Sequence, residues 1–176
     1  VSRSLFFSGV ATILAALWGT PIAMLIGLRE FRGKSIVKSF FSTLIGMPTV
    51  ALGLVLYLIF SRAGPLGPLG LLYTPGAIIL GEAVLVTPLI TSIMTAAIEA
   101  VDPEMMSLAR TLGASESQTS IAVLREAVNG VIFSNVTGFN RAIAELGVAL
   151  MVGGNIGGAG AHSTDVLTTS ISTLTA

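Results

Sequence analysis

The sequence predicts an all-α integral membrane protein, built as a polytopic bundle of membrane-spanning helices. Hydrophobic residues make up 53% of its 176 residues and charged residues only 10%, whereas a soluble domain averages about 25% charged residues. Mean hydropathy is +0.91. The apolar residues gather in long uncharged stretches of about 20 residues or more, the length that a helix needs to cross a bilayer. These three observations together favour a membrane bundle over a soluble domain.

The composition and the absence of certain motifs exclude several classes of protein function. Nine basic and nine acidic residues balance, so nothing predicts a nucleic-acid-binding surface. The absence of cysteine excludes disulfides, thiolate metal sites and a cysteine nucleophile. His162 is the single histidine and has no companions spaced as metal ligands. The chain carries no zinc-protease, serine-hydrolase or phosphate-loop motif. We therefore expect no enzyme active site, no metal and no cofactor.

Four segments are predicted to span the membrane: residues 4–28, 39–61, 76–98 and 127–152. A signal peptide is the alternative for the first, because Arg3 precedes it. Its apolar stretch is longer than the roughly 7–15 residues of a signal peptide, however, and no small-residue cleavage site follows. Residues 165–176 resemble the start of another helix. The chain begins with Val1, so we expect a fragment of a longer protein.

The connections between the spans give the orientation. Residues 62–75 contain three prolines and three glycines, which excludes a regular helix there. Six Lys and Arg residues lie in segment 29–38 and in the polar interval 99–126, against Arg62 and Arg3 on the other side. Because loops rich in Lys and Arg stay in the cytoplasm, the interval 99–126 is predicted to be cytoplasmic and the glycine-rich segment 153–164 external.

The interval 99–126 is predicted to form two short helices joined at a glycine. Asp102 is placed to cap the first helix, and Pro103 suits its first position. Gly113 is placed as a left-handed terminator. Ser115, with a glutamine three residues later, forms a capping box that starts the second helix. An apolar face follows Met105, Leu108, Ala109 and Leu112 at helical spacing. We expect this elbow to dock on a partner protein.

The fourth predicted span has two different faces. One face is apolar and comprises Ile132, Val136, Phe139, Ile143, Leu146 and Leu150. The other face comprises Ser134, Gly138, Arg141 and Glu145. A charge inside a span costs about 2.5–3.5 kcal/mol on insertion scales and usually faces a bundle interior or a water-filled cavity. Two interpretations remain open: this face lines a translocation path in which Arg141 meets an anion, or Arg141 and Glu145 form a structural ion pair one turn apart.

Two further polar features allow more than one interpretation. Glu82 interrupts the third span, where it is a proton relay, a partner for Arg141 or a residue near the outer interface. Its position seven residues after Pro75 favours the interface. Gly153, Gly154 and Asn155 begin a glycine-rich segment that is a turn, a helix-packing motif or an anion-binding nest. The neighbouring loops favour the turn.

With these features together, the sequence resembles the inner-membrane permease subunits of bacterial and archaeal ABC importers, most of all the tungstate-type permeases. The most specific segments are 138–147 (GFNRAIAELG) followed by 152–156 (VGGNI), then 61–67 (SRAGPLG) with 71–75 (LLYTP), and 111–114 (TLGA). The last belongs to the cytoplasmic loop of importer permeases, E-A-A-x-x-x-G followed by I-x-L-P. Here Gly113 and Ala109 match the glycine and the second alanine, whereas Ser107 and Leu108 replace the glutamate and the first alanine. Val123 stands at the isoleucine, and Arg125 and Glu126 depart from the leucine and proline.

The resemblance implies a type I importer permease in the cytoplasmic (inner) membrane of a bacterium or archaeon, with an external N-terminus and a fifth helix beyond Ala176. It implies a homodimer in the lipid bilayer, two cytoplasmic ATP-binding subunits and an extracytoplasmic oxyanion-binding protein. The cargo it implies is an oxyanion, tungstate first and molybdate next. The loop residues that it assigns to ATPase coupling are Ser107, Leu108, Ala109, Leu112, Gly113, Ala114 and Val123. The path residues expected are Ser134, Gly138, Asn140, Arg141 and Glu145, with Gly153, Gly154 and Asn155 in the outer loop.

Two other classes would also fit part of the pattern. A secondary transporter or channel would explain the charged span without an ATPase. A membrane scaffold that transports nothing would explain the apolar spans alone. The transporter or channel does not account for the capped elbow, and co-purification of a nucleotide-binding subunit distinguishes it from an ABC permease. The scaffold predicts no uptake defect when the protein is deleted.

Overall fold

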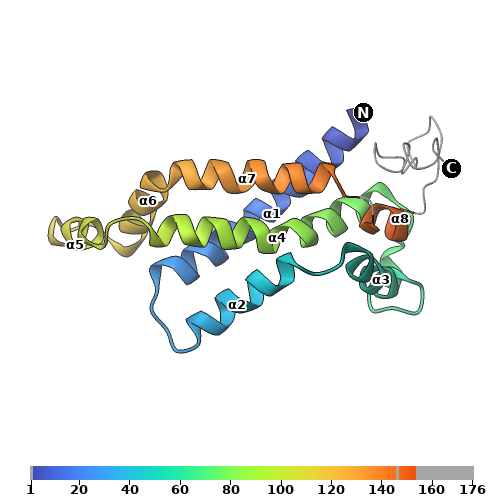
Figure 1. Ribbon diagram of the computed structural model, residues 1–176, viewed down its shortest axis with the longest axis horizontal. Coiled ribbons are helices and arrows are strands. Elements are labelled where there is room, and N and C mark those ends of the chain that lie inside the picture. Colours follow the sequence, from blue (N-terminus) through green and yellow to red (C-terminus); the bar gives the residue numbers. More distant parts are fainter. Residues whose placement is uncertain (1, 146, 154–176) are drawn as a thin grey trace. The chain divides into compact units, whose positions relative to one another are not determined.

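The computed structural model describes residues 2–145 and 147–153, and within these ranges the ordered secondary structure is entirely helical. The helices, shown in Figure 1, are α1 (Ser2–Leu28), α2 (Lys34–Ile45), α3 (Thr49–Phe60), the short 3₁₀ helix η1 (Gly67–Leu69), α4 (Pro75–Glu99), α5 (Pro103–Thr111), α6 (Glu116–Glu126), α7 (Val128–Ile143) and α8 (Gly147–Gly153). The predicted all-α class is confirmed.

Two of the described helices are long and apolar enough to cross a membrane by themselves. They are the segment Ser4–Leu28 of α1 and the helix Pro75–Glu99, α4. Both contain an internal proline, Pro21 and Pro88, which membrane helices tolerate when neighbouring groups satisfy the freed carbonyls. The number of candidate spans among the described residues rises to three if α2 and α3 are counted together as one broken span.

The predicted span 39–61 is not one continuous helix. The structure divides it into α2, which ends at Ile45, and α3, which begins at Thr49. Pro48 lies at the break and serves as the N-cap residue of α3. Proline has no N–H to donate to the preceding turn and disfavours a helical conformation at the residue before it. The chain therefore leaves α2 at Ile45 and restarts at Thr49.

The predicted span 127–152 is also divided. Helix α7 ends at Ile143 and α8 begins at Gly147. The 16 residues of α7 are fewer than the roughly 20 that a perpendicular span needs. The connection 62–75, in contrast, contains only turns and the single turn η1 between Gly67 and Leu69, as its prolines and glycines predicted.

The described residues form two compact units, and the first contains parts of segments 1–15, 46–86 and 139–176. In this unit α3 packs against α8 (Figure 1). The core of the contact comprises Leu56, Phe60, Ala77, Val148 and Val152. Gly81 of α4 permits α8 to approach α4 closely, since a Cβ atom at Gly81 would lie 2.5 Å from Cγ1 of Val148. The Tyr73 amide donates a hydrogen bond to the Val152 carbonyl at 2.9 Å, which ties the loop to the end of α8.

The second unit contains segments 16–45 and 87–138. Within it the indole N–H of Trp18 donates a 2.6 Å hydrogen bond to the Thr87 hydroxyl, which links α1 to α4. Gly27 lies so close to Ile98 that an added Cβ would be 2.6 Å from Ile98 Cγ2. The elbow α5–α6, predicted to be cytoplasmic, belongs to this unit together with these parts of α1 and α4.

Candidate functional site

The first elbow helix, α5, begins where the sequence predicted. The Asp102 side chain accepts a 2.9 Å hydrogen bond from the Glu104 amide, and Pro103 occupies the first helical position. Glu104 also places a negative charge in the first turn, where the helix dipole is positive. Local residue chemistry thus fixes the start of the elbow directly after α4.

Gly113 ends α5 in the left-handed conformation, with φ +85°. The Gly113 amide donates to the Arg110 carbonyl and the Ala114 amide to the Ala109 carbonyl, each at 3.0 Å. These two bonds are those of a Schellman motif, which satisfies carbonyls that would otherwise lack partners at a helix end. An added Cβ at Gly113 would meet nothing within 4 Å, so only backbone conformation selects glycine there.

The second elbow helix, α6, starts with the predicted capping box. The Ser115 hydroxyl accepts from the Gln118 amide at 3.3 Å, and the Ser115 amide donates to the Gln118 side chain at 2.8 Å. Val123 is only 1% exposed and Thr119 only 5%. Helix α6 is therefore held by its buried side, and Val123 belongs to that buried side rather than to a docking face.

Helix α5 and its C-cap residue present two leucines outward. None of its residues is buried, and Leu108 and Leu112 are 60% and 80% exposed. Ser107 and Gly113 are also exposed, while Ala109 and Ala114 are half-buried. Exposed leucines outside the apolar spans cost solvation free energy unless a partner covers them. Six of the seven predicted coupling residues thus lie at an accessible surface.

The predicted path residues separate into buried and exposed groups. Ser134 and Gly138 are buried on α7, whereas Asn140 and Arg141 are exposed. The Ser134 hydroxyl donates to the Val131 carbonyl of its own helix at 2.8 Å. On the opposite face, Ile132 and Val136 are 57% and 52% exposed. The small residues of the predicted polar face, Ser134 and Gly138, therefore lie inward, whereas Arg141 of the same face is exposed.

Glu145 lies beyond the end of α7 and is 4% exposed. Its Oε1 atom accepts a 3.0 Å hydrogen bond from the Val148 amide, so the carboxylate caps α8. Because α7 ends at Ile143, Arg141 and Glu145 are not one turn apart on a common helix. The two residues therefore do not share the continuous helix that the spacing assumed, and both interpretations of this face stay predictions.

Glu82 is buried, with 2% of its surface exposed. The Ser8 hydroxyl donates a hydrogen bond to its carboxylate, and Glu145 lies within electrostatic range. Its Oε2 atom has no hydrogen-bond partner among the described residues. The structure thus brings together two acidic residues that the sequence analysis treated separately, and both lie inside the first unit.

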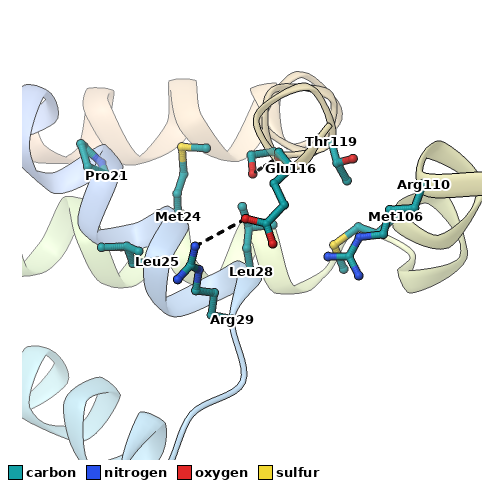
Figure 2. Close-up of a pocket in the computed structure, with 10 residues that line it drawn as sticks. Pro21, Met24, Leu25, Leu28, Arg29, Met106, Arg110, Glu116 and Thr119 are labelled. Carbon is teal, nitrogen blue, oxygen red and sulfur yellow. Dashed lines mark hydrogen bonds and ion pairs between the residues drawn. The ribbon is translucent and has the colours of Figure 1, made fainter. Parts of the chain in front are cut away.

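A pocket of about 290 Å³ lies beside the elbow, within the second unit. It is lined by Pro21, Met24, Leu25 and Leu28 of α1, by Arg29, by Met106 and Arg110 of α5, and by Glu116, Thr119 and Ser120 of α6. Figure 2 shows these side chains, with Arg29 and Glu116 joined across the pocket at 3.7 Å. Sequence reasoning missed this pocket, because its parts are distant in the chain and no motif links them.

A charge cluster joins the start of α2 to the end of α4. The Lys38 ammonium lies 2.6 Å from Oε2 of Glu99, and that of Lys34 lies 3.1 Å from Oε1 of Glu99 and 2.8 Å from Glu30. The sequence analysis used these lysines only as topology signals. In the sequence, the spacing of four residues between Glu30 and Lys34 indicates an ion pair between these two residues. It does not indicate that Glu99 joins them.

The predicted outer loop is described only at its first residue. Gly153 is the last residue of α8. Gly154, Asn155 and His162 lie outside the described residues, as does the segment 165–176.

Comparison with known proteins gives the family. The model of the family described as "Binding-protein-dependent transport system inner membrane component" matches residues 19–175. A probable anion ABC transporter permease protein of Haloferax volcanii is 40% identical over 153 residues, which cover 87% of this chain and 66% of that protein. A tungstate uptake system permease protein TupB of Peptoclostridium acidaminophilum is 39% identical over 97% of this chain and 73% of its own length.

A second tungstate uptake system permease protein TupB, from Campylobacter jejuni, is 34% identical over 98% of this chain and 70% of its own length. The family match covers most of the chain, and two relatives above 30% identity are covered over more than two thirds of their length. The chain therefore belongs to the inner-membrane components of binding-protein-dependent transport systems, the permeases with the all-helical type I fold that the sequence resemblance indicated.

Proposed function

We propose that this chain is the permease subunit of an ABC importer that carries a tetrahedral oxyanion across the inner membrane, tungstate in the first place and molybdate in the second. The names of the relatives support an anion cargo: one is an anion transporter permease and two belong to tungstate uptake systems. Others of lower identity are molybdate/tungstate and molybdenum permeases. The chain itself carries no catalytic site, and a separate subunit hydrolyses ATP.

The observation that carries the ATP-coupled part of the proposal is the exposed apolar face of α5. Leu108 and Leu112 are 60% and 80% exposed on a helix that is fixed at both ends by its caps. A rigid helix with outward leucines fits a groove in a partner, the usual mode by which an amphipathic helix docks. The partner proposed is the cytoplasmic ATP-binding subunit, and Val123 holds the elbow from its buried side.

The proposed path lies at the interface of two copies of the permease. Closure of the two ATP-binding subunits draws the two elbows together and switches the spans between inward-open and outward-open arrangements. Arg141 is exposed in the single chain, as a residue facing a second copy or a pore would be. A guanidinium forms charge-assisted, bidentate hydrogen bonds with a tetrahedral oxyanion. Asn140, also exposed, adds a neutral donor.

An extracytoplasmic binding protein delivers the oxyanion in this proposal. A deep static site in the permease would hold the ion and slow its release, so the selection among oxyanions belongs mainly to the binding protein. The permease then needs only transient donors along the path. The buried hydroxyl of Ser134 is already bonded within its own helix, which leaves Arg141 as the principal donor on this face.

The test is ATP-dependent uptake by the permease reconstituted in vesicles with its ATP-binding subunit and its binding protein. Labelled tungstate should accumulate only with hydrolysable ATP, and unlabelled molybdate should compete better than sulfate. Accumulation without nucleotide would identify a secondary transporter. Absence of any oxyanion uptake by the complete complex would remove the cargo assignment.

A matched pair of variants tests the docking face. Leu112 and Leu69 are both exposed, by 80% and 63%, but Leu69 lies in η1, on the side predicted to be external. Leu112→Glu should abolish co-purification of the ATP-binding subunit and ATP-dependent uptake, because it places a charge in the apolar groove. Leu69→Glu should leave co-purification unchanged. Equal co-purification of both variants would show that α5 is not the docking helix.

A further inference from the structure

The pocket between α1 and the elbow combines features that the transport proposal does not use. Its wall along α1 is apolar, formed by Pro21, Met24, Leu25 and Leu28. Arg29 follows directly after the apolar span that ends at Leu28. One side of the pocket is therefore the last turns of a membrane helix, and its rim is cationic. Such a pocket suits an amphiphilic anion, whose apolar part would contact the wall and whose charged group would pair with the cations at the rim.

The cations at the rim are available for a ligand. The ion pair between Arg29 and Glu116 is 3.7 Å long, and its side chains are 67% and 82% exposed, so solvent screens it strongly. Arg110 lines the same pocket and makes no ion pair with another described residue. Two guanidinium groups thus face a single carboxylate, and an incoming anion can replace Glu116 as the partner of Arg29.

Thr119 supplies an independent sign of a missing partner. It is 5% exposed and lines the pocket, yet its Oγ1 has no hydrogen-bond partner among the described residues. Thr43 and Thr137, by contrast, donate to the carbonyl four residues earlier, each at 2.8 Å. The buried hydroxyls of Thr91 and Thr95 in α4 share the unpartnered state of Thr119, but neither faces this pocket. A buried hydroxyl without a partner costs about 1–3 kcal/mol. The Oγ1 atom is covered by protein atoms in the ligand-free chain, so a ligand oxygen in the pocket would satisfy it once the Thr119 side chain rotates toward the pocket.

We propose that this pocket binds a tetrahedral oxyanion group, either the phosphate of an anionic phospholipid or a free oxyanion. Arg110 and Arg29 pair with the oxygens, and the Thr119 hydroxyl donates a further hydrogen bond. The apolar wall favours the phospholipid, because the acyl chains continue along α1 while the headgroup lies at its cationic end. Basic pockets at the end of membrane helices bind anionic headgroups in this way. The leucines of the docking face, Leu108 and Leu112, do not line the pocket, so the site is separate from the proposed ATPase contact.

The experiment compares thermal unfolding of the delipidated full chain in detergent with four additions. They are phosphatidylglycerol, phosphatidylcholine, inorganic phosphate and tungstate. Phosphatidylglycerol should raise the unfolding temperature and phosphatidylcholine should not. Removing one guanidinium should weaken the binding about fivefold, the equivalent of about 1 kcal/mol per basic residue near a lipid surface.

Arg110→Gln should therefore show a reduced shift with phosphatidylglycerol. Arg125→Gln is the matched control, since Arg125 and Arg110 occupy the last turns of the two elbow helices but only Arg110 lines the pocket. Glu116→Gln should increase the shift, because it removes the competing carboxylate. Thr119→Val should stabilise the ligand-free protein while reducing the shift, a combination that a purely structural hydroxyl would not give.

The four additions distinguish a phospholipid headgroup from a free oxyanion as the ligand. Shifts with phosphate or tungstate alone, lost in Arg110→Gln, would support the oxyanion site and assign it to a free ion instead of a lipid. The proposal is overturned if Arg110→Gln and Arg125→Gln respond equally to every addition. The unfolding assay does not depend on ATP-driven uptake, so a failure of the pocket proposal and a failure of the transport proposal are distinguishable.

Discussion

The Glu145 carboxylate lies 3.0 Å from the Val148 amide and caps the short helix α8. From the sequence, Glu145 has two interpretations, a residue lining the translocation path or the partner of Arg141 in a structural ion pair. Glu145 is 4% exposed, near the buried Glu82. Its carboxylate binds the first turn of α8. Helix α8 in turn contributes Val148 and Val152 to the core that it shares with α3.

Replacing Glu145 should therefore affect stability first. Glu145→Ala removes the acceptor of the Val148 N–H and should cost about 0.5–2 kcal/mol, the usual range for loss of an N-cap. Glu145→Gln keeps an oxygen acceptor and should cost less. Thermal unfolding in detergent measures both. If Glu145→Ala unfolds like the unsubstituted protein but loses uptake, Glu145 acts in the path and not as a cap.

The elbow could be predicted accurately because its determinants are local. Asp102 bonds two residues ahead, Ser115 and Gln118 bond each other, and Gly113 needs only its own backbone conformation. Each of these interactions joins residues that are only a few positions apart, so the local sequence pattern is enough to predict it. The family match confirms the resemblance, which rested mainly on the segments 138–147, 152–156, 61–67 and 71–75.

The helix breaks were harder to predict. Pro48 was visible in the sequence, but whether a proline kinks a membrane helix or divides it depends on what surrounds the freed carbonyls. At 143–147 the spacing of Arg141 and Glu145 favoured a continuous helix, and glutamate is not among the preferred N-cap residues. The pocket depends on Arg29 and Thr119, which are distant in the chain and meet only in the folded unit.

Arg141 carries the sharpest functional prediction. Because its side chain is exposed, Arg141→Ala should leave folding and membrane insertion intact. It should nevertheless abolish oxyanion uptake, since it removes the proposed cationic donor of the path. Labelled tungstate uptake, normalised to the amount of protein in the membrane, measures the effect. Arg141→Lys keeps the charge but not the bidentate geometry and should retain part of the activity. Unchanged uptake in Arg141→Ala would remove this residue from the path.

Gly113 and Gly33 form a matched pair for testing the elbow. Both have positive φ, +85° and +95°, and neither has an atom within 4 Å of an added Cβ. Valine at either position should cost about 1–2 kcal/mol through backbone strain alone. Gly113→Val should also release the ATP-binding subunit, because it alters the angle between α5 and α6. Gly33→Val, in the loop before α2, should not. Co-purification with the ATP-binding subunit measures the difference, and equal retention would contradict a coupling role for the elbow.

Helix α7 lies close to α4 at Gly130, where an added Cβ would overlap the Cβ of Ala97. Gly130→Ala should therefore destabilise the protein by about 1–3 kcal/mol, the usual cost of overpacking a filled contact. The reciprocal change Ala97→Gly vacates the space that the new methyl group needs. The double variant Ala97→Gly/Gly130→Ala should recover much of the lost stability, and the coupling in a double-mutant cycle of unfolding free energies should be favourable by about 0.5–3 kcal/mol. Both residues lie in the second unit, so the cycle reports on packing inside that unit alone. Additive effects of the two substitutions would mean that α4 and α7 are not in direct contact at this point.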